Sequence, residues 1–182
     1  MSVELALPDN PLVEAICESP ALDLQSQQRQ TILAGIIEND FSREALSNRL
    51  QLVTGTVRSR MRTIHQRLGT KSAAQVLDTV FSTLAVHELS DAEINQGLRD
   101  IKSPEVSDIS LFQVEVDAIR FTASAGSCKD AAIILGKTEG TVRNQLAETY
   151  DRLCATTPKY LRSLPLAYLT LRKLDILPVG TE

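Results

Sequence analysis

The chain has 182 residues, of which 43% are hydrophobic and 23% are charged, and its formal net charge is −4, a composition typical of an ordinary soluble protein. Only 4% of the residues are aromatic and Trp is absent, so an all-β fold is disfavoured and an all-α fold is expected. The three Cys residues lie far apart, so we expect neither disulfides nor a zinc site. The N-terminus lacks the basic and apolar regions of a signal peptide, and no apolar run approaches the roughly twenty residues of a membrane span. We therefore expect a reduced, cytoplasmic protein.

Helix signals begin near the N-terminus. Asn10 and Pro11 have the residue types of an N-cap and a first helical position, and they predict a short helix that reaches about Glu18. Apolar residues at helical spacing predict a second helix over residues 24–38.

Three more helices are expected before residue 87. Ser42 caps a short helix, Thr54 caps a longer helix that runs to Leu68, and Ser72 caps a helix with a broad apolar face. Gly69 stands where a C-cap glycine belongs.

The helical pattern continues after residue 88. Ser90 and Glu93 form a capping-box pattern that predicts a connecting helix to about Ile101. The earlier order then repeats, with helices expected over 111–124, over a short segment that Gly136 ends, and over 138–153.

A last helix is expected to begin at Thr157 and Pro158, and Pro165 is expected to kink it. These signals divide the chain into an acidic N-terminal extension (1–23), unit one (24–87), a helical linker (88–108) and unit two (109–182).

A four-residue phrase occurs twice in the sequence. Gly-Thr-Val-Arg at 55–58 returns at 140–143, a period of 85 residues, and each copy precedes an Arg-Leu pair by nine residues. Such a period indicates two small units rather than a solenoid. In both units the phrase follows a short helix and a turn, which is where a helix-turn-helix protein begins its recognition helix.

Charge is distributed in blocks along the chain. Residues 1–40 contain seven acids and one base, and residues 87–117 contain eight acids and two bases. Residues 41–86 instead contain seven bases and two acids. Because salt screens charges that are more than about 10 Å apart, this local excess of bases decides phosphate binding more than the net charge does.

The repeated region resembles the LuxR-type (GerE-like) DNA-binding domain. The resemblance is carried by Leu-Gly-Lys-Thr-Glu-Gly-Thr-Val-Arg-Asn at 135–144 and by Arg-Leu-Gly-Thr-Lys-Ser-Ala-Ala-Gln-Val at 67–76. Region 4 of sigma factors shares Gly-Thr-Val-Arg-Ser-Arg at 55–60, but the tail after Leu68 is more similar to the LuxR type. The resemblance covers roughly 24–86 and 109–172 and implies two tandem four-helix helix-turn-helix domains.

The longer helix of unit one carries most of the candidate DNA-binding residues. Arg58 and Arg62 are four residues apart and share a face with Ser59, opposite an apolar stripe. Hydroxyls at the helix N-terminus can contact a phosphate with the help of the helix dipole. The resemblance implies that Arg58, Ser59 and Arg62 read bases, whereas the alternative interpretation is a solvated basic face. The predicted DNA-binding set is Thr54, Thr56, Arg58, Ser59, Arg60, Arg62, His65 and Lys71, followed in unit two by Arg143 and Asn144.

Unit two departs from this pattern. Ala147 stands at the position of Arg62, and Glu139 stands at the position of Thr54. Because an acid near a phosphate opposes binding, a helix-turn-helix kept for packing or for protein contacts is an equal alternative in this unit.

The sequence therefore predicts a transcriptional regulator that binds double-stranded DNA mainly through unit one, with no enzymatic activity and no cofactor. The alternative is a protein-interaction regulator that binds RNA polymerase, a sigma factor or another regulator through unit two. The apolar faces of the last helix of each unit exceed what one small core can cover, so they must pack elsewhere. Either the two faces pack on each other within one chain, which makes a pseudo-symmetric monomer, or they pair between chains, and the homodimer is the favoured expectation.

Overall fold

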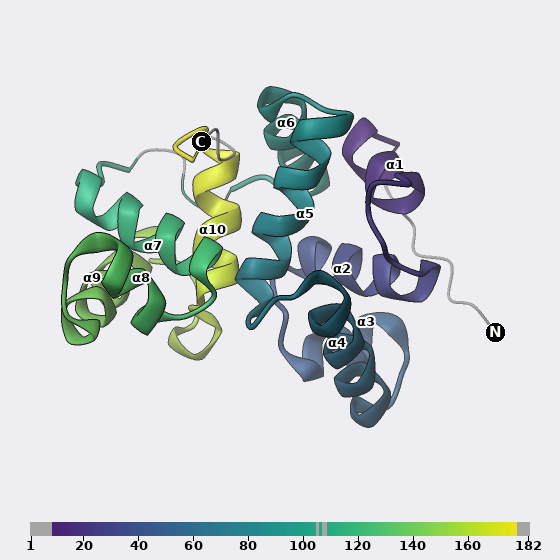
Figure 1. Cartoon of the computed structure of the whole chain (residues 1–182), viewed down its shortest axis with the longest axis horizontal. Helices are drawn as coiled ribbons and strands as arrows, with labels where there is room; N and C mark the ends of the chain where they lie inside the picture. The colour runs from purple at the N-terminus through teal and green to yellow at the C-terminus, as the bar shows by residue number, and fades with distance from the viewer. Residues whose placement is uncertain (1–8, 105, 107–108, 178–182) are drawn as a thin grey trace.

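Every regular element that the structure describes is a helix (Figure 1). The computed structural model describes residues 9–104, 106 and 109–177. The predicted all-α fold is confirmed.

The helices follow the predicted order. Unit one contains α2 (Ser26–Glu38), α3 (Arg43–Leu50), α4 (Thr54–Leu68) and α5 (Ala73–His87), and α1 (Pro11–Glu18) precedes it. After α6 (Asp91–Ile101), unit two contains α7 (Gln113–Ala125), α8 (Cys128–Leu135), α9 (Glu139–Leu153), a short 3₁₀ helix η1 (Lys159–Leu161) and α10 (Leu164–Lys173).

Local capping sets most of these boundaries. The side chains of Asn10, Ser42 and Ser72 accept hydrogen bonds from backbone N–H groups three residues later, as predicted. Ser90 and Glu93 form the predicted capping box at the start of α6. Gly69 adopts a left-handed φ of 65° at the end of α4, a conformation that a glycine reaches without steric cost.

One predicted N-cap and one predicted helix start were wrong. Val53, not Thr54, is the N-cap of α4, and no side chain caps this helix. Thr157 and Pro158 precede only η1, and α10 begins at Leu164. Pro165 therefore lies in the first turn of α10, where its missing N–H has no carbonyl partner to lose, and it does not kink the helix.

The same three-helix packing occurs in both units. Helices α2, α3 and α4 pack against one another in pairs, and α7, α8 and α9 do the same. One continuous hydrophobic core nevertheless runs from Leu12 in α1 to Leu177 after α10, so the two units share their main core.

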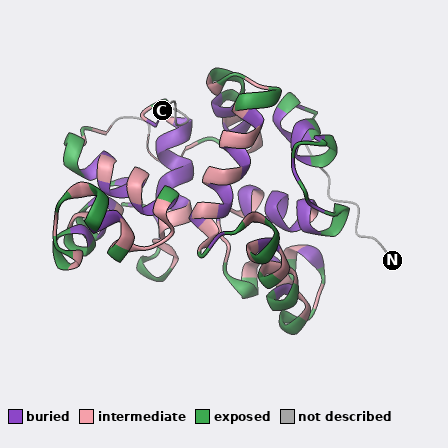
Figure 2. Ribbon diagram, in the orientation of Figure 1, coloured by how far each residue is buried: buried purple, intermediate pink, exposed green. Residues whose placement is uncertain are grey.

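The broad apolar faces of α5 and α10 are covered within the chain. Figure 2 shows buried residues along both helices, and every residue from Leu166 to Lys173 is buried. The rings of Phe81 and Tyr168 stack with their centroids 6.3 Å apart, and the Tyr168 hydroxyl lies 2.9 Å from Oδ1 of Asp78. Of the two expected arrangements, the structure shows packing within the chain, because α5 contacts α7 and α10 contacts α5. This packing removes the reason for expecting a homodimer.

Helices α1 and α6 also contribute to the core, although they belong to the segments predicted as an extension and a linker. Leu12, Ile16, Ile94 and Leu98 are fully buried. Gly97 lies so close to Leu12 that a Cβ atom at this position would clash. The segments around the two units are therefore part of one packed structure.

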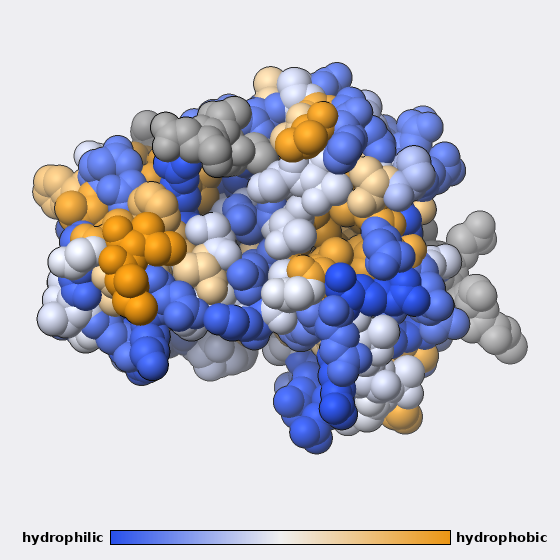
Figure 3. All heavy atoms as spheres, viewed as in Figure 1, coloured by the Kyte–Doolittle hydropathy of each residue, from blue (hydrophilic) through white to orange (hydrophobic). Residues whose placement is uncertain are grey.

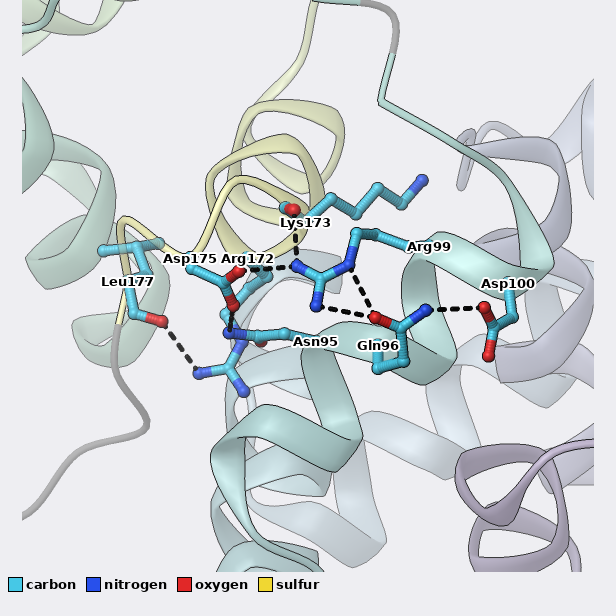
Figure 4. A network of polar contacts seen from close by, with 8 residues as sticks. All are labelled: Asn95, Gln96, Arg99, Asp100, Arg172, Lys173, Asp175 and Leu177. Atoms are coloured by element: carbon cyan, nitrogen blue, oxygen red, sulfur yellow. Dashed lines mark hydrogen bonds and ion pairs between the residues drawn. The ribbon is translucent and has the colours of Figure 1, made fainter. Parts of the chain in front are cut away.

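A polar network joins α6 to the end of α10 (Figure 4). Arg99 Nη1 donates to the Lys173 carbonyl over 2.9 Å and to Asp175 Oδ2 over 2.7 Å. Asn95 Nδ2 donates to the other carboxylate oxygen of Asp175 over 2.8 Å. This network fixes the residues that follow α10 against α6.

No helix within the described ranges has the length and apolar character needed to span a membrane.

Candidate nucleic-acid interface

Helix α4 is held by an apolar stripe. Val57 and Ile64 are fully buried and lie seven residues apart, on one face of the helix. Val57 packs in a small cluster with Ala34, Leu46 and Leu50 under α3. This anchoring fixes the rotation of α4 about its axis and therefore fixes which side chains face outward.

The outward face of α4 carries uncompensated positive charge. Arg58, Ser59 and Arg62 are exposed, as predicted. Within the described part of the chain, neither Arg58 nor Arg62 takes part in an ion pair. Figure 3 shows the most hydrophilic colour gathered over α4. Two guanidinium groups with free donors are thus presented on a rigid helix.

This face continues into a groove of about 670 Å³ beside α4. One wall is the start of α3 and the other is the turn between α4 and α5. The lining residues are Phe41, Arg43, Arg58, Met61, Arg62, His65, Gln66, Thr70, Lys71 and Ala73. None of these ten residues is acidic, and four of them are Lys or Arg, so the groove favours an anion.

Arg43 was missed by the sequence analysis. It is the first residue of α3, and folding brings it to the groove that Arg58 and Arg62 line. Its only signal in the sequence is membership of the basic block 41–86.

His65 and Lys71 line the groove but already have partners. Nδ1 of His65 lies 2.9 Å from the Thr70 hydroxyl, and burial lowers the pKa of His65, which keeps the ring neutral at pH 7. Lys71 Nζ lies 2.9 Å from Asp130 Oδ2 in unit two. His65 therefore supplies no charge to the groove, and a phosphate would have to compete with Asp130 for Lys71.

The remaining predicted residues of unit one have unequal exposure. Thr54 is exposed in the first turn of α4, and Thr56 is half-buried. Arg60 is half-buried and lies about 200° around the helix from Arg58, so it points away from the outward face.

In unit two the predicted arginine is neutralised by its own helix. Arg143 Nη2 lies 2.6 Å from Glu139 Oε1, an i,i+4 pair at the start of α9. Asn144 is exposed beside it. Helix α8 exposes Ile133 and Ile134, by 73% and 56%, at the repeat positions of Asn48 and Arg49. The surface of unit two is therefore less cationic and more apolar than the equivalent surface of unit one.

The interpretation of these surfaces depends on their geometry and chemistry. Comparisons of the chain with protein-family models, with curated proteins and with solved structures found no match.

Proposed function

We propose that the protein binds double-stranded DNA, and thereby regulates transcription, by placing α4 in a major groove. The observation that carries this proposal is the exposed pair Arg58 and Arg62, which have no ion-pair partner in the described part of the chain and stand on one face of a helix that Val57 and Ile64 anchor. A helix is about 10–12 Å wide and the major groove is about 12 Å wide, so α4 fits with its outward face toward the bases.

The side chains divide into two roles in this proposal. Arg58 and Arg62 reach guanine O6 and N7, the commonest specific contact of an arginine, and Ser59 lies between them. Arg43 and the exposed N-terminus of α4 at Thr54 contact phosphates, which position the protein without reading sequence.

A second function is favoured by unit two. Glu139 forms an ion pair with Arg143, and Ile133 and Ile134 are exposed on α8. These observations favour a protein contact rather than DNA reading by this unit. In this alternative the protein regulates transcription by holding RNA polymerase, a sigma factor or another regulator through unit two.

DNA selection from a random double-stranded library with the full-length protein tests the main proposal. We expect enrichment of a defined sequence, and we expect Arg58→Ala and Arg62→Ala each to weaken that enrichment. Arg143→Ala is the matched control, because it removes the arginine at the equivalent repeat position of unit two. An unenriched library contradicts DNA reading, and equal losses with Arg143→Ala contradict the assignment of unit one as the main reader.

A further inference from the structure

Helix α8 presents an apolar surface flanked by positive charge. Ile133 and Ile134 are exposed by 73% and 56%, and Figure 3 shows strongly hydrophobic surface over α8. Lys129 is exposed one helical turn before Ile133. Lys137 lies just after α8, beyond the left-handed Gly136, where it is half-exposed and its Nζ donates to Gln145 Oε1 over 3.2 Å. The nearby carboxylate of Asp130 is paired with Lys71. Lys129, Ile133, Ile134 and Lys137 are called the α8 face below.

A groove of complementary character lies between α1 and the segment that joins α5 to α6. Its volume is about 280 Å³, and its lining residues are Pro11, Glu14, Ala15, Glu18, Ser19, Pro20, Glu88 and Leu89. Glu14 and Glu18 are exposed and lie one helical turn apart on α1. Two prolines, an alanine and a leucine supply its apolar lining, and glutamates lie at its edge. This groove is called the α1 groove below.

We propose that the α8 face of one copy docks into the α1 groove of a second copy. Ile133 and Ile134 then leave water against the apolar walls, while Lys129 and Lys137 meet Glu14 and Glu18. A large exposed aliphatic pair rimmed by polar residues is typical of an interface, and opposite charges at its rim select the partner and the orientation.

Pairing of two α8 faces with each other is disfavoured. An isologous contact repeats the same patch on both sides of a two-fold axis. It would bring the lysines of one copy toward the lysines of the other, and like charges across an interface oppose association. The head-to-tail contact instead pairs each lysine with a glutamate.

The contact joins two different surfaces and therefore leaves one of each free. Figure 1 places α1 and α8 at opposite ends of the longest axis of the molecule. A docked copy still exposes its own α1 groove or its own α8 face, so association continues beyond a dimer. The proposal is independent of DNA binding.

Sedimentation of the full-length protein over a range of concentrations tests the proposal. We expect the weight-average mass to rise past that of a dimer and to fall again at high salt, because salt screens the rim charges. Ile133→Asp should leave a monomer. Tyr160→Asp replaces another exposed large hydrophobic side chain of unit two with the same acid and is the matched control, which should associate like the natural protein.

Charge reversal distinguishes this contact from any other. The double variants Lys129→Glu with Lys137→Glu, and Glu14→Lys with Glu18→Lys, should each be monomeric, because each places like charges on both surfaces. A mixture of the two double variants should associate again, since the reversed α8 face of one then meets the reversed α1 groove of the other. Circular dichroism establishes that each variant is folded. A natural protein that stays monomeric into the high micromolar range, or a folded mixture that does not associate, overturns the proposal.

Discussion

Arg29 is a buried residue that joins several segments of the backbone by hydrogen bonds, and its replacement should destabilise the whole chain. Its side chain is 9% exposed and donates hydrogen bonds to four backbone carbonyls. The bonds run to Leu24 over 2.8 Å, to Ile16 over 2.9 Å, to Ser19 over 2.8 Å and to Leu22 over 2.6 Å. The guanidinium therefore joins the end of α1 and the loop after it to α2.

The cost of Arg29→Met follows from these partners. The Ile16 carbonyl would normally accept from the residue four positions later, but that residue is Pro20, which has no N–H. Methionine fills the volume but removes the donor to the Ile16 and Leu24 carbonyls, whereas the Ser19 and Leu22 carbonyls still accept from the backbone N–H groups of Leu22 and Leu24. Each hydrogen bond to a charged group contributes about 1.5–3 kcal/mol, but the bonds of one side chain are not additive. We expect a net loss of about 3 kcal/mol in the free energy of unfolding.

Urea unfolding followed by circular dichroism measures this loss. For a chain of this size the expected loss corresponds to a decrease in Tm of about 6–12 °C. Arg29→Lys should lie between the natural protein and Arg29→Met, because one ammonium keeps the charge but cannot reach all four carbonyls. Arg58→Met, an exposed arginine on α4, should change stability by less than about 0.5 kcal/mol. If Arg29→Met unfolds at the same urea concentration as the natural protein, the hydrogen bonds of Arg29 do not hold α1 in place.

Substitutions on α4, at the start of α3 and at Asp130 each test DNA binding by the full-length protein. Arg58→Ala and Arg62→Ala should each cost about 1–3 kcal/mol of specific binding, or about 5- to 150-fold in Kd, and unchanged affinity in both would exclude α4 as the reader. Arg43→Ala should weaken binding to all sequences alike, and the negative slope of log K against log salt should become about 1 less steep. A loss confined to the preferred sequence would show that Arg43 reads a base. Asp130→Asn should tighten binding in low salt because it frees Lys71 for a phosphate, and equal affinity would mean that DNA does not use this lysine.

Local signals in the sequence were sufficient to predict most helices and the outward face of α4. Ser42, Ser72 and Ser90 each cap a helix through contacts only three residues long, which a linear sequence displays directly. The ion pair between Arg143 and Glu139 was not predicted, although its i,i+4 spacing places the two side chains together on any helix.

Contacts between distant segments could not be predicted in this way. Lys71 and Asp130 are 59 residues apart, and nothing in their local sequence indicates that they meet. The breadth of the apolar face on α5 was evident, but the choice between a partner in the same chain and one in a second chain was not, because a periodic pattern shows that a face is buried without showing by what. The same limit applies to Arg43, which reaches the groove beside α4 only through tertiary packing.

The two units share the same pairwise contacts among three helices but have different surfaces, and small changes account for the difference. Thr54 in unit one corresponds to Glu139 in unit two, and this single acid pairs the arginine that would otherwise be free. Asn48 and Arg49 correspond to Ile133 and Ile134, which replace a polar helix surface with an apolar one. Neither change touches the buried positions that hold the three helices together.

The shared core also fixes the direction in which each surface faces, because α5 and α10 pack across both units. A duplication of this kind keeps a stable scaffold while it frees the second copy for a new contact. This difference in surface is the reason that we propose DNA reading for α4 and protein contact for α8.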